Sequence, residues 1–174
     1  MKHILTGLTV ILIASAFFAC KDDDAEKRRQ YELKKLRDYI QNNYPDLKPK
    51  SSGLYYIELE EGIGDSIKIG DKVQIFYDIW DLDTTWITGS GQFEPLELVV
   101  LSPTQLSYSA EDIDEMLGLH EALTYMKKGT RSLLIVPSEL AFGQYGVSGI
   151  NGFTSLRMEV EVYKVFPLQT AEEE

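Results

Sequence analysis

Apolar and polar residues alternate along two stretches of the chain with the period of two that is typical of half-buried β-strands. The first stretch places four side chains on one face: Val73, Ile75, Tyr77 and Ile79. In the second stretch, residues 156–162, apolar side chains alternate with charged ones. Shorter β-rich runs predict three further strands, at residues 54–59, 96–100 and 132–136. The chain is therefore expected to contain an antiparallel sheet.

A helical period interrupts this series of strands. Four apolar residues there share one helix face at positions i, i+3, i+4 and i+7: Leu119, Ala122, Leu123 and Met126. They predict one short helix over residues 119–127. Lys127 and Lys128 would complement the negative end of its dipole, and Gly129 would take the left-handed position that closes it.

A second helical pattern lies in the highly charged residues 25–43, where Leu33, Leu36 and Ile40 form one narrow apolar stripe. Two interpretations fit this stripe. It packs the helix against one edge of the domain, or it binds a second copy of the chain or another partner. A spacer that lifts the domain off a membrane is compatible with both. No pattern in the sequence predicts the oligomeric state.

Together these elements predict an α+β fold, in which a bent antiparallel sheet wraps around one short helix and is preceded by an N-terminal helix. Residues 81–91 are predicted to be a polar loop. The chain divides into four predicted segments: an export signal at 1–19, a tether with the charged helix at 20–50, the folded domain at 51–166 and a flexible tail at 167–174.

Composition narrows the classes of function. A chain of 174 residues is long enough for one domain with a substantial core. The net charge of −11 argues against a nucleic-acid partner, because phosphate binding requires clustered Lys and Arg. The single cysteine, Cys20, excludes an internal disulfide and a zinc site built from several cysteines.

The N-terminus has the layout of an export signal. Lys2 precedes an apolar run at 4–18 that is short for a membrane span, and an acidic stretch begins after Lys21. Cys20 resembles the cysteine of the bacterial lipobox, which is cut free and lipidated. This resemblance implies a cell-envelope lipoprotein, anchored to a bacterial membrane such as the outer membrane, on its periplasmic or its surface face. The alternative is a chance cysteine after an ordinary signal, and the acidic residues fit either a surface-sorting tag or a solvated tether.

The usual catalytic constellations are missing from the sequence. Its two histidines are His3, in the signal, and His120, which we expect to be solvated or to cap a helix. No Ser-His-Asp or Cys-His pair can be assembled from them. The carboxylates between Glu111 and Glu115 are expected to form a solvated loop face rather than a metal site. Any enzyme here would work without a nucleophile, and we expect no metal and no cofactor.

Rotation about an X-Pro peptide bond fits these limits because it breaks no covalent bond. It must overcome the loss of amide resonance, a barrier of roughly 18–20 kcal/mol. The twisted amide is less polar than the planar one, so a dry pocket of aromatic and aliphatic side chains favours the transition state. Such an enzyme needs apolar walls for the proline ring and a few hydrogen bonds to the flanking peptide.

Five segments resemble the FKBP-type peptidyl-prolyl cis-trans isomerases, in the order in which that family carries them. They read SGLYY (52–56), GDKVQIFY (70–77), GLHEALTYMKKG (118–129), VPSELAFG (136–143) and LRMEVEV (156–162). The resemblance covers the chain from Ser51 to Val165. It implies the FKBP fold and an isomerase that acts on proline-containing polypeptides without a cofactor. With the lipobox, the chain is similar to the isomerase lipoproteins associated with gliding motility.

The same resemblance places a proline pocket on this sequence. It implies catalytic contacts from Tyr77, Ile87 and Phe142. It also implies six substrate-binding positions: Trp86, Leu96, Met116, Leu119, Ile150 and Met158. Among these, Met116 would offer its backbone N–H to the peptide carbonyl, and Leu119 stands where many members have a tryptophan floor. The alternative for each apolar residue is plain core packing.

Several positions depart from the family pattern. Fully active members usually carry a tyrosine in place of Phe142, and its hydroxyl donates to the bound peptide. The family's pocket aspartate is replaced by Thr88, and the rim loop at 150–153 lacks the usual Pro-Pro. The connection at 101–115 is longer than usual, and we expect it to fold over the pocket as a lid or recognition loop.

Three functions are compatible with this pattern. The leading hypothesis is a peptidyl-prolyl isomerase that assists the folding of exported or surface proteins. The second is a catalytically weak or inactive FKBP-like module that holds proline-containing segments as a binding protein or chaperone. The third is a structural accessory of a surface machine, which rests only on the predicted anchor and helix.

Overall fold

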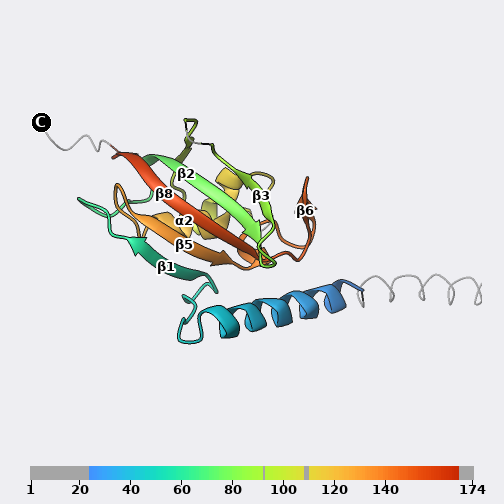
Figure 1. Cartoon of the computed structure of the whole chain (residues 1–174). Helices are drawn as coiled ribbons and strands as arrows, with labels where there is room; N and C mark the ends of the chain where they lie inside the picture. The colour runs from blue at the N-terminus through green and yellow to red at the C-terminus, as the bar shows by residue number, and fades with distance from the viewer. Residues whose placement is uncertain (1–23, 92, 108–109, 169–174) are drawn as a thin grey trace, which may run out of the picture.

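The computed structural model describes residues 24–91, 93–107 and 110–168 (Figure 1). Its strands are β1 (Tyr55–Glu60), β2 (Lys72–Asp81), β3 (Trp86–Gly89), β4 (Leu96–Val99), β5 (Arg131–Val136), β6 (Gly146–Val147), β7 (Ile150–Asn151) and β8 (Leu156–Phe166). Its short helices are α2 (Leu117–Leu123) and the 3-10 turns η1 (Pro103–Gln105), η2 (Ile113–Glu115) and η3 (Ser138–Leu140). Residues 24–43 are helical and are called the N-terminal helix below.

A six-stranded antiparallel sheet forms the centre of the molecule, with the strand order β1-β5-β8-β2-β3. The long strand β2 pairs with β8 along one edge. Along its other edge it pairs first with β4 and then with β3. A separate two-stranded hairpin is made by β6 and β7. The α+β class and the bent sheet around one short helix are as the sequence predicts.

The alternating pattern of the sequence sorts side chains onto the two faces of this sheet. Inward-facing residues such as Ile75 of β2 and Met158 of β8 are fully buried in the cluster that surrounds α2. Every residue of α2 except Glu121 is buried. Gly118 permits this close approach, because a Cβ atom there would lie 2.7 Å from Cγ1 of Val136.

The short helix is shorter than its apolar spacing predicts. Helical spacing extends over residues 119–127, but α2 ends at Leu123. A tertiary hydrogen bond redirects the chain, because the Met126 carbonyl accepts from the Ile67 N–H at 3.0 Å. Met126 is still fully buried. Gly129 has the expected positive φ, 83°, but in the turn that enters β5 rather than at the end of the helix.

Residues 81–91 contain a strand as well as the predicted loop. The segment Trp86–Gly89 forms β3, which extends the sheet beside β2. Asp81 shapes the preceding turn, since its Oδ1 accepts the backbone N–H groups of Asp83 and Thr85, each at 2.9 Å. Four residues are too few for alternation to be recognised against the polar residues around them.

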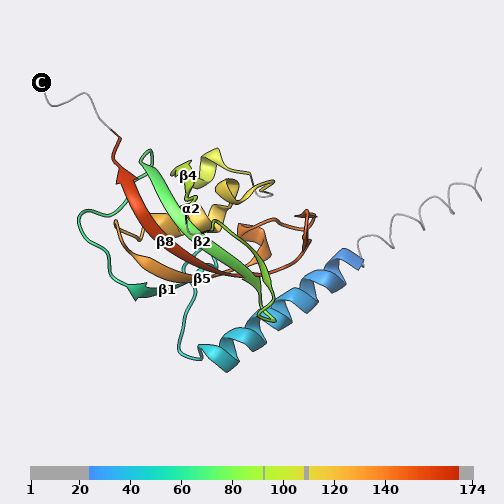
Figure 2. The same cartoon turned by 45° about the horizontal axis from the view of Figure 1, so that its top comes forward.

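The N-terminal helix packs on the outer face of the sheet, on the side away from α2 (Figure 2). Leu36 and Ile40 from its apolar stripe join Leu133 and Ile135 of β5 in a second buried cluster. The two β5 residues point away from the main core, so the helix is what removes them from water. The stripe therefore serves packing within the chain, as the first interpretation of it predicts.

Several predicted features lie outside the described residues. These are the export signal at 1–19, Cys20 and the tail from residue 169 on. Leu168 still contacts the domain, because its N–H donates to Oδ1 of Asp71 at 2.9 Å. Within the described ranges, no helix combines the length and the apolar character needed to cross a membrane.

Candidate active site

A groove of about 830 Å³ opens between β3, η2 and the β6–β7 hairpin. Four of the predicted site residues line it: Trp86, Ile87, Phe142 and Ile150. Trp86 stands at the rim with 58% of its surface exposed, and its indole Nε1–H donates to Oδ1 of Asp78 at 2.9 Å. Phe142 and Ile150 are buried at the core side of the groove, with 2% and 6% of their surface exposed. The structure thus brings these four residues together.

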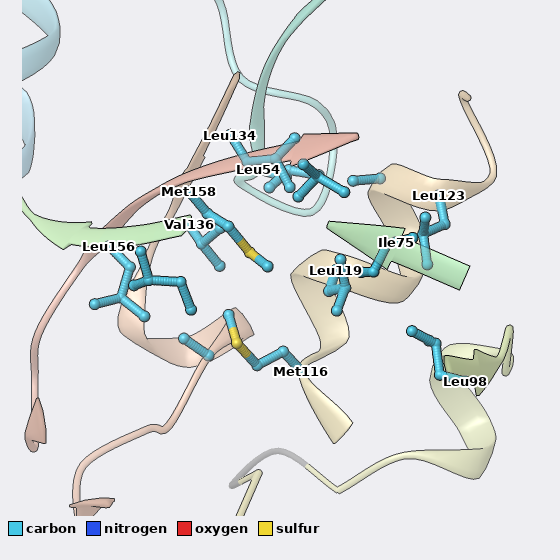
Figure 3. Packing of buried hydrophobic residues seen from close by; sticks show 14 of the residues in the cluster. Leu54, Ile75, Leu98, Met116, Leu119, Leu123, Leu134, Val136, Leu156 and Met158 are labelled. Carbon is cyan, nitrogen blue, oxygen red and sulfur yellow. The ribbon is translucent and has the colours of Figure 1, made fainter. Parts of the chain in front are cut away.

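Three other predicted residues belong to the core rather than to the groove lining. Met116, Leu119 and Met158 are fully buried, and Figure 3 shows their side chains converging between α2 and β8. Phe142 and Ile150 are members of the same cluster. Leu96 packs against it from β4 and is partly buried. The packing of these residues therefore supports the groove from below.

Tyr77 lies on the inward-facing side of β2 and is partly buried against the core. Burial raises the pKa of its hydroxyl, and the carboxylates of Asp112, Asp114 and Asp78 raise it further. Two hydrogen bonds of 3.0 Å fix its backbone to Ser90, whose Oγ accepts the Tyr77 N–H and whose N–H donates to the Tyr77 carbonyl. The hydroxyl is therefore protonated at physiological pH, and Tyr77 is not among the residues that line the groove.

The turn that carries Phe142 is closed by backbone hydrogen bonds. The Ser138 carbonyl accepts the Gly143 N–H at 2.8 Å, and the Phe142 carbonyl accepts the Gly146 N–H at 3.0 Å. Gly146 has a φ of 69°, and a Cβ atom there would lie 2.1 Å from the carbonyl oxygen of Ile150. Only glycine fits this position, so the two turns hold Phe142 and Ile150 in one arrangement.

The backbone N–H of Met116, predicted to hold the peptide carbonyl, already has a partner. It donates to the Ile113 carbonyl at 3.2 Å, at the end of η2. This distance is at the long limit for an N–H···O bond, so the interaction is weak. A bound peptide would have to share this donor or displace Ile113 from it.

His120 fixes the long connection at 101–115. Its Nδ1 accepts the Leu101 N–H at 3.0 Å, so the ring proton lies on Nε2, which donates to the Asp114 carbonyl at 2.6 Å. Only 1% of the residue is exposed, and this burial lowers the pKa of the imidazole. The expectation of a solvated histidine is therefore wrong, because the ring joins the two ends of the connection.

Carboxylates dominate the charge of the groove. Four of them line it: Asp81, Asp83, Glu111 and Asp112. Among the described residues of the lining, Lys35 is the one basic side chain, and it pairs with Asp83 at 2.6 Å. Thr88, at the position of the family's pocket acid, also lines the groove. Two of these acidic groups, Glu111 and Asp112, belong to the 101–115 connection. Within the described ranges, no group of three or more His, Cys, Asp or Glu side chains could hold a metal ion.

The family relationship follows from comparison with known proteins. A model of the FKBP-type peptidyl-prolyl cis-trans isomerase family matches residues 64–163. This chain belongs to that family. The matched segment contains the whole groove lining apart from Lys35, and it confirms the family that the five sequence segments indicate.

Individual relatives agree with this assignment. The FKBP-type peptidyl-prolyl cis-trans isomerase FkpA of Escherichia coli K12 is 29% identical over 155 residues, which are 86% of this chain and 49% of that protein. The chain therefore spans about half the length of this relative. The FK506-binding protein of Neisseria meningitidis serogroup B is 28% identical over 66% of this chain and 97% of its own length. The crystal structure of Escherichia coli FkpA matches with a TM-score of 0.66 at 27% identity, over 95% of this chain and 71% of that one.

Two carboxylates with structural roles were not predicted. Asp112 is exposed, as the prediction of a solvated loop face requires, but it also lines the groove, and its charge raises the pKa of Tyr77. Glu32 belongs to the charged N-terminal helix, yet only 3% of it is exposed. A signal existed for Glu32, because it precedes Leu36 and Ile40 by four and eight positions and so shares their face of the helix. None existed for Asp112, since loop side chains have no periodicity.

Proposed function

We propose that this chain catalyses the cis-trans isomerisation of X-Pro bonds in polypeptides that bind in the groove. The observation that carries the proposal is the convergence of Ile87, Phe142 and Ile150 in one groove of an FKBP family member. Aromatic and aliphatic walls suit a proline ring, and Trp86 at the rim offers a further flat apolar surface for the neighbouring residue.

The chemistry would follow from desolvation and positioning. Loss of conjugation makes the twisted amide less polar, so apolar walls favour it over the planar ground state. Each ~1.4 kcal/mol of this preference accelerates rotation tenfold. The family resemblance assigns the orienting contact to Tyr77, which packs partly buried against the core that supports the groove and does not itself line the groove. No proton transfer to a reacting atom is needed, because no covalent bond is broken.

A specific observation favours the second candidate function, a binding module with little catalysis. The Met116 N–H is occupied by Ile113, and Phe142 has no hydroxyl to donate to a peptide. With Thr88 in place of the family's acid, three polar contacts that would hold the peptide are weakened or missing. An apolar groove could still retain proline-containing segments without accelerating their rotation.

The clients and the location are part of the same proposal. We infer that Cys20 carries the lipid that anchors the protein to a bacterial membrane of the cell envelope. The groove would then act on exported or surface proteins, outside the cytoplasm. The support is the order of an apolar run, Cys20 and a charged stretch in the sequence.

A proline-tetrapeptide isomerisation assay on the full chain decides between the two functions. The enzyme is supported by a rate enhancement that falls about tenfold or more in Ile87→Ala, because this variant removes one wall of the groove. Ile63→Ala is the matched control, since Ile63 is 73% exposed and does not line the groove. Peptide binding without any rate enhancement would instead establish the binding module.

A further inference from the structure

The N-terminal helix reaches the two loops that hold the groove residues Phe142 and Ile150. One loop is the turn from Ser138 to Gly143, and the other runs from Ile150 to Ser155 into β8. The apolar half of the helix packs on the sheet, as described above. Its preceding, charged half carries the contacts to these loops.

Glu32 makes the central contact. Its carboxylate accepts the Ser138 N–H at 2.9 Å, the Ser138 hydroxyl at 2.8 Å and the Ser155 hydroxyl at 2.7 Å. Arg29, one turn before Glu32 in the helix, donates to the same carboxylate at 2.5 Å. The acceptor and the two serine donors are nearly out of water, with exposed fractions of 3% for Glu32, 1% for Ser138 and 3% for Ser155. A carboxylate with so many donors in a dry site is held in one position.

Two arginines extend this contact. Arg29 also pairs with Glu139, the residue after Ser138. Arg28 donates to the Gly152 carbonyl at 3.1 Å, and its guanidinium lies 5.3 Å from the centre of the Phe153 ring. The helix therefore holds both loops at more than one point.

The contact with Ser138 leads directly to the groove. Glu32 binds the N–H and hydroxyl of Ser138, while the Ser138 carbonyl closes the turn around Phe142 by accepting the Gly143 N–H. The Gly143 carbonyl in turn accepts the N–H of Phe153, which lies in the other loop, at 2.9 Å. Displacing Ser138 would thus move Phe142 and loosen the loop that follows Ile150.

We propose that the N-terminal helix is a positioning element of the groove, and that Glu32 is the positioning residue through which it acts. The inference rests on the proposed function, because it concerns the same groove. It assigns the helix a role in peptide turnover beyond that of a spacer or a stabilising element. Glu32 touches no substrate in this scheme and acts through Ser138 and Ser155.

The test compares Glu32→Gln with Glu26→Gln in the full chain. Glu26 is an exposed residue of the same helix, and its carboxylate accepts a hydrogen bond from the Gln30 amide at 2.7 Å. In Glu32→Gln an amide NH₂ faces a donor of Ser138 or Ser155, so we expect kcat/KM for a prolyl peptide to fall about threefold to tenfold. The assay is run at a temperature at which thermal melting curves show that both variants are folded. Glu26→Gln should retain wild-type kcat/KM.

A second variant covers the case in which Glu32→Gln does not fold. Arg28 is exposed, and Arg28→Ala removes its contacts to Gly152 and Phe153. We expect this variant to have a kcat/KM about twofold to threefold below that of the wild type and an unchanged melting temperature. The positioning role is overturned if folded Glu32→Gln keeps wild-type kcat/KM, or if Arg28→Ala does so when Glu32→Gln is unfolded.

An inactive wild-type protein would contradict the proposed function but not by itself the positioning role. Amide hydrogen exchange of residues 142–151 then decides the latter. Faster exchange there in Glu32→Gln than in Glu26→Gln supports positioning, whereas equal exchange in the two variants overturns it. Arg28→Ala is measured in the same way if Glu32→Gln is unfolded.

Discussion

The carboxylate of Glu32 binds both donors of Ser138, the backbone N–H at 2.9 Å and the hydroxyl at 2.8 Å, across 106 positions of the sequence. This pair joins the N-terminal helix to the turn that leads to Phe142. Removing the helix would take away the charged acceptor of both donors, and a hydrogen bond to a charged group contributes about 1.5–3 kcal/mol. A domain cut at Ser51 is therefore not equivalent to the same domain within the whole chain.

Restoring the family's hydroxyl at the groove should raise activity. In Phe142→Tyr the new hydroxyl would reach the groove and donate to a bound peptide, because Phe142 lines that surface. One positioning hydrogen bond is worth about 0.5–1.5 kcal/mol, so kcat/KM should rise about twofold to tenfold. The measurement is prolyl-peptide isomerisation at fixed temperature. Unchanged activity, with the variant folded, would mean that the missing hydroxyl does not limit turnover.

The acidic lining should select peptides by charge. We expect kcat/KM to be about threefold to tenfold higher when the residue beside proline is Lys than when it is Glu. Salt at about 1 M should reduce this ratio towards one, because exposed charges are screened at short range. The measurement is isomerisation of a matched pair of peptides at low and high salt.

Asp112 is the residue that tests this preference within the protein. Asp112→Asn should reduce the Lys-to-Glu ratio, since the carboxylate lines the groove. Asp65→Asn is the control with the same change of charge, because Asp65 lies at a different part of the surface. Equal ratios in the two variants would rule out a local effect of Asp112.

The buried His120 should make stability depend on pH. Burial lowers its pKa in the folded state below the unperturbed value of 6.5, so at lower pH the unfolded chain binds a proton that the folded chain does not. The free energy of unfolding should therefore fall as the pH decreases from about 7 through 6.5 towards the folded pKa. Urea unfolding at several pH values measures this slope, and His120→Asn should show a smaller one. An equal slope in both proteins would contradict the assignment.

The predicted anchor depends on one side chain. Replacing Cys20 with Ser removes the thiol that would carry the lipid, so the protein should leave the membrane fraction and appear in the soluble envelope fraction. Cell fractionation followed by immunoblotting measures this distribution. A Cys20→Ser protein that stays with the membranes would show that the lipid assignment is wrong.

Local patterns were sufficient for most of the fold. The alternation in residues 73–80 and 156–162 predicts β2 and β8, because a strand with one buried face must repeat its apolar residues every second position. The short strand β3 and the early end of α2 were not predicted. The strand β3 has only four residues, too few for a recognisable alternation, and the end of α2 involves the hydrogen bond between Ile67 and Met126, which leaves no periodic signal.

The sequence alone determined the fold class, the family and the residue types that build the groove, because these follow from periodic patterns and from motifs of adjacent residues. The tertiary structure decided which of those residues face the groove and which lie in the core. It placed the charge of Asp112 where it raises the pKa of Tyr77, buried His120 between the ends of one connection, and set Glu32 against Ser138. The reason is physical: burial and pairing depend on where the folded backbone places each side chain, and residues far apart in sequence meet only once the chain has folded.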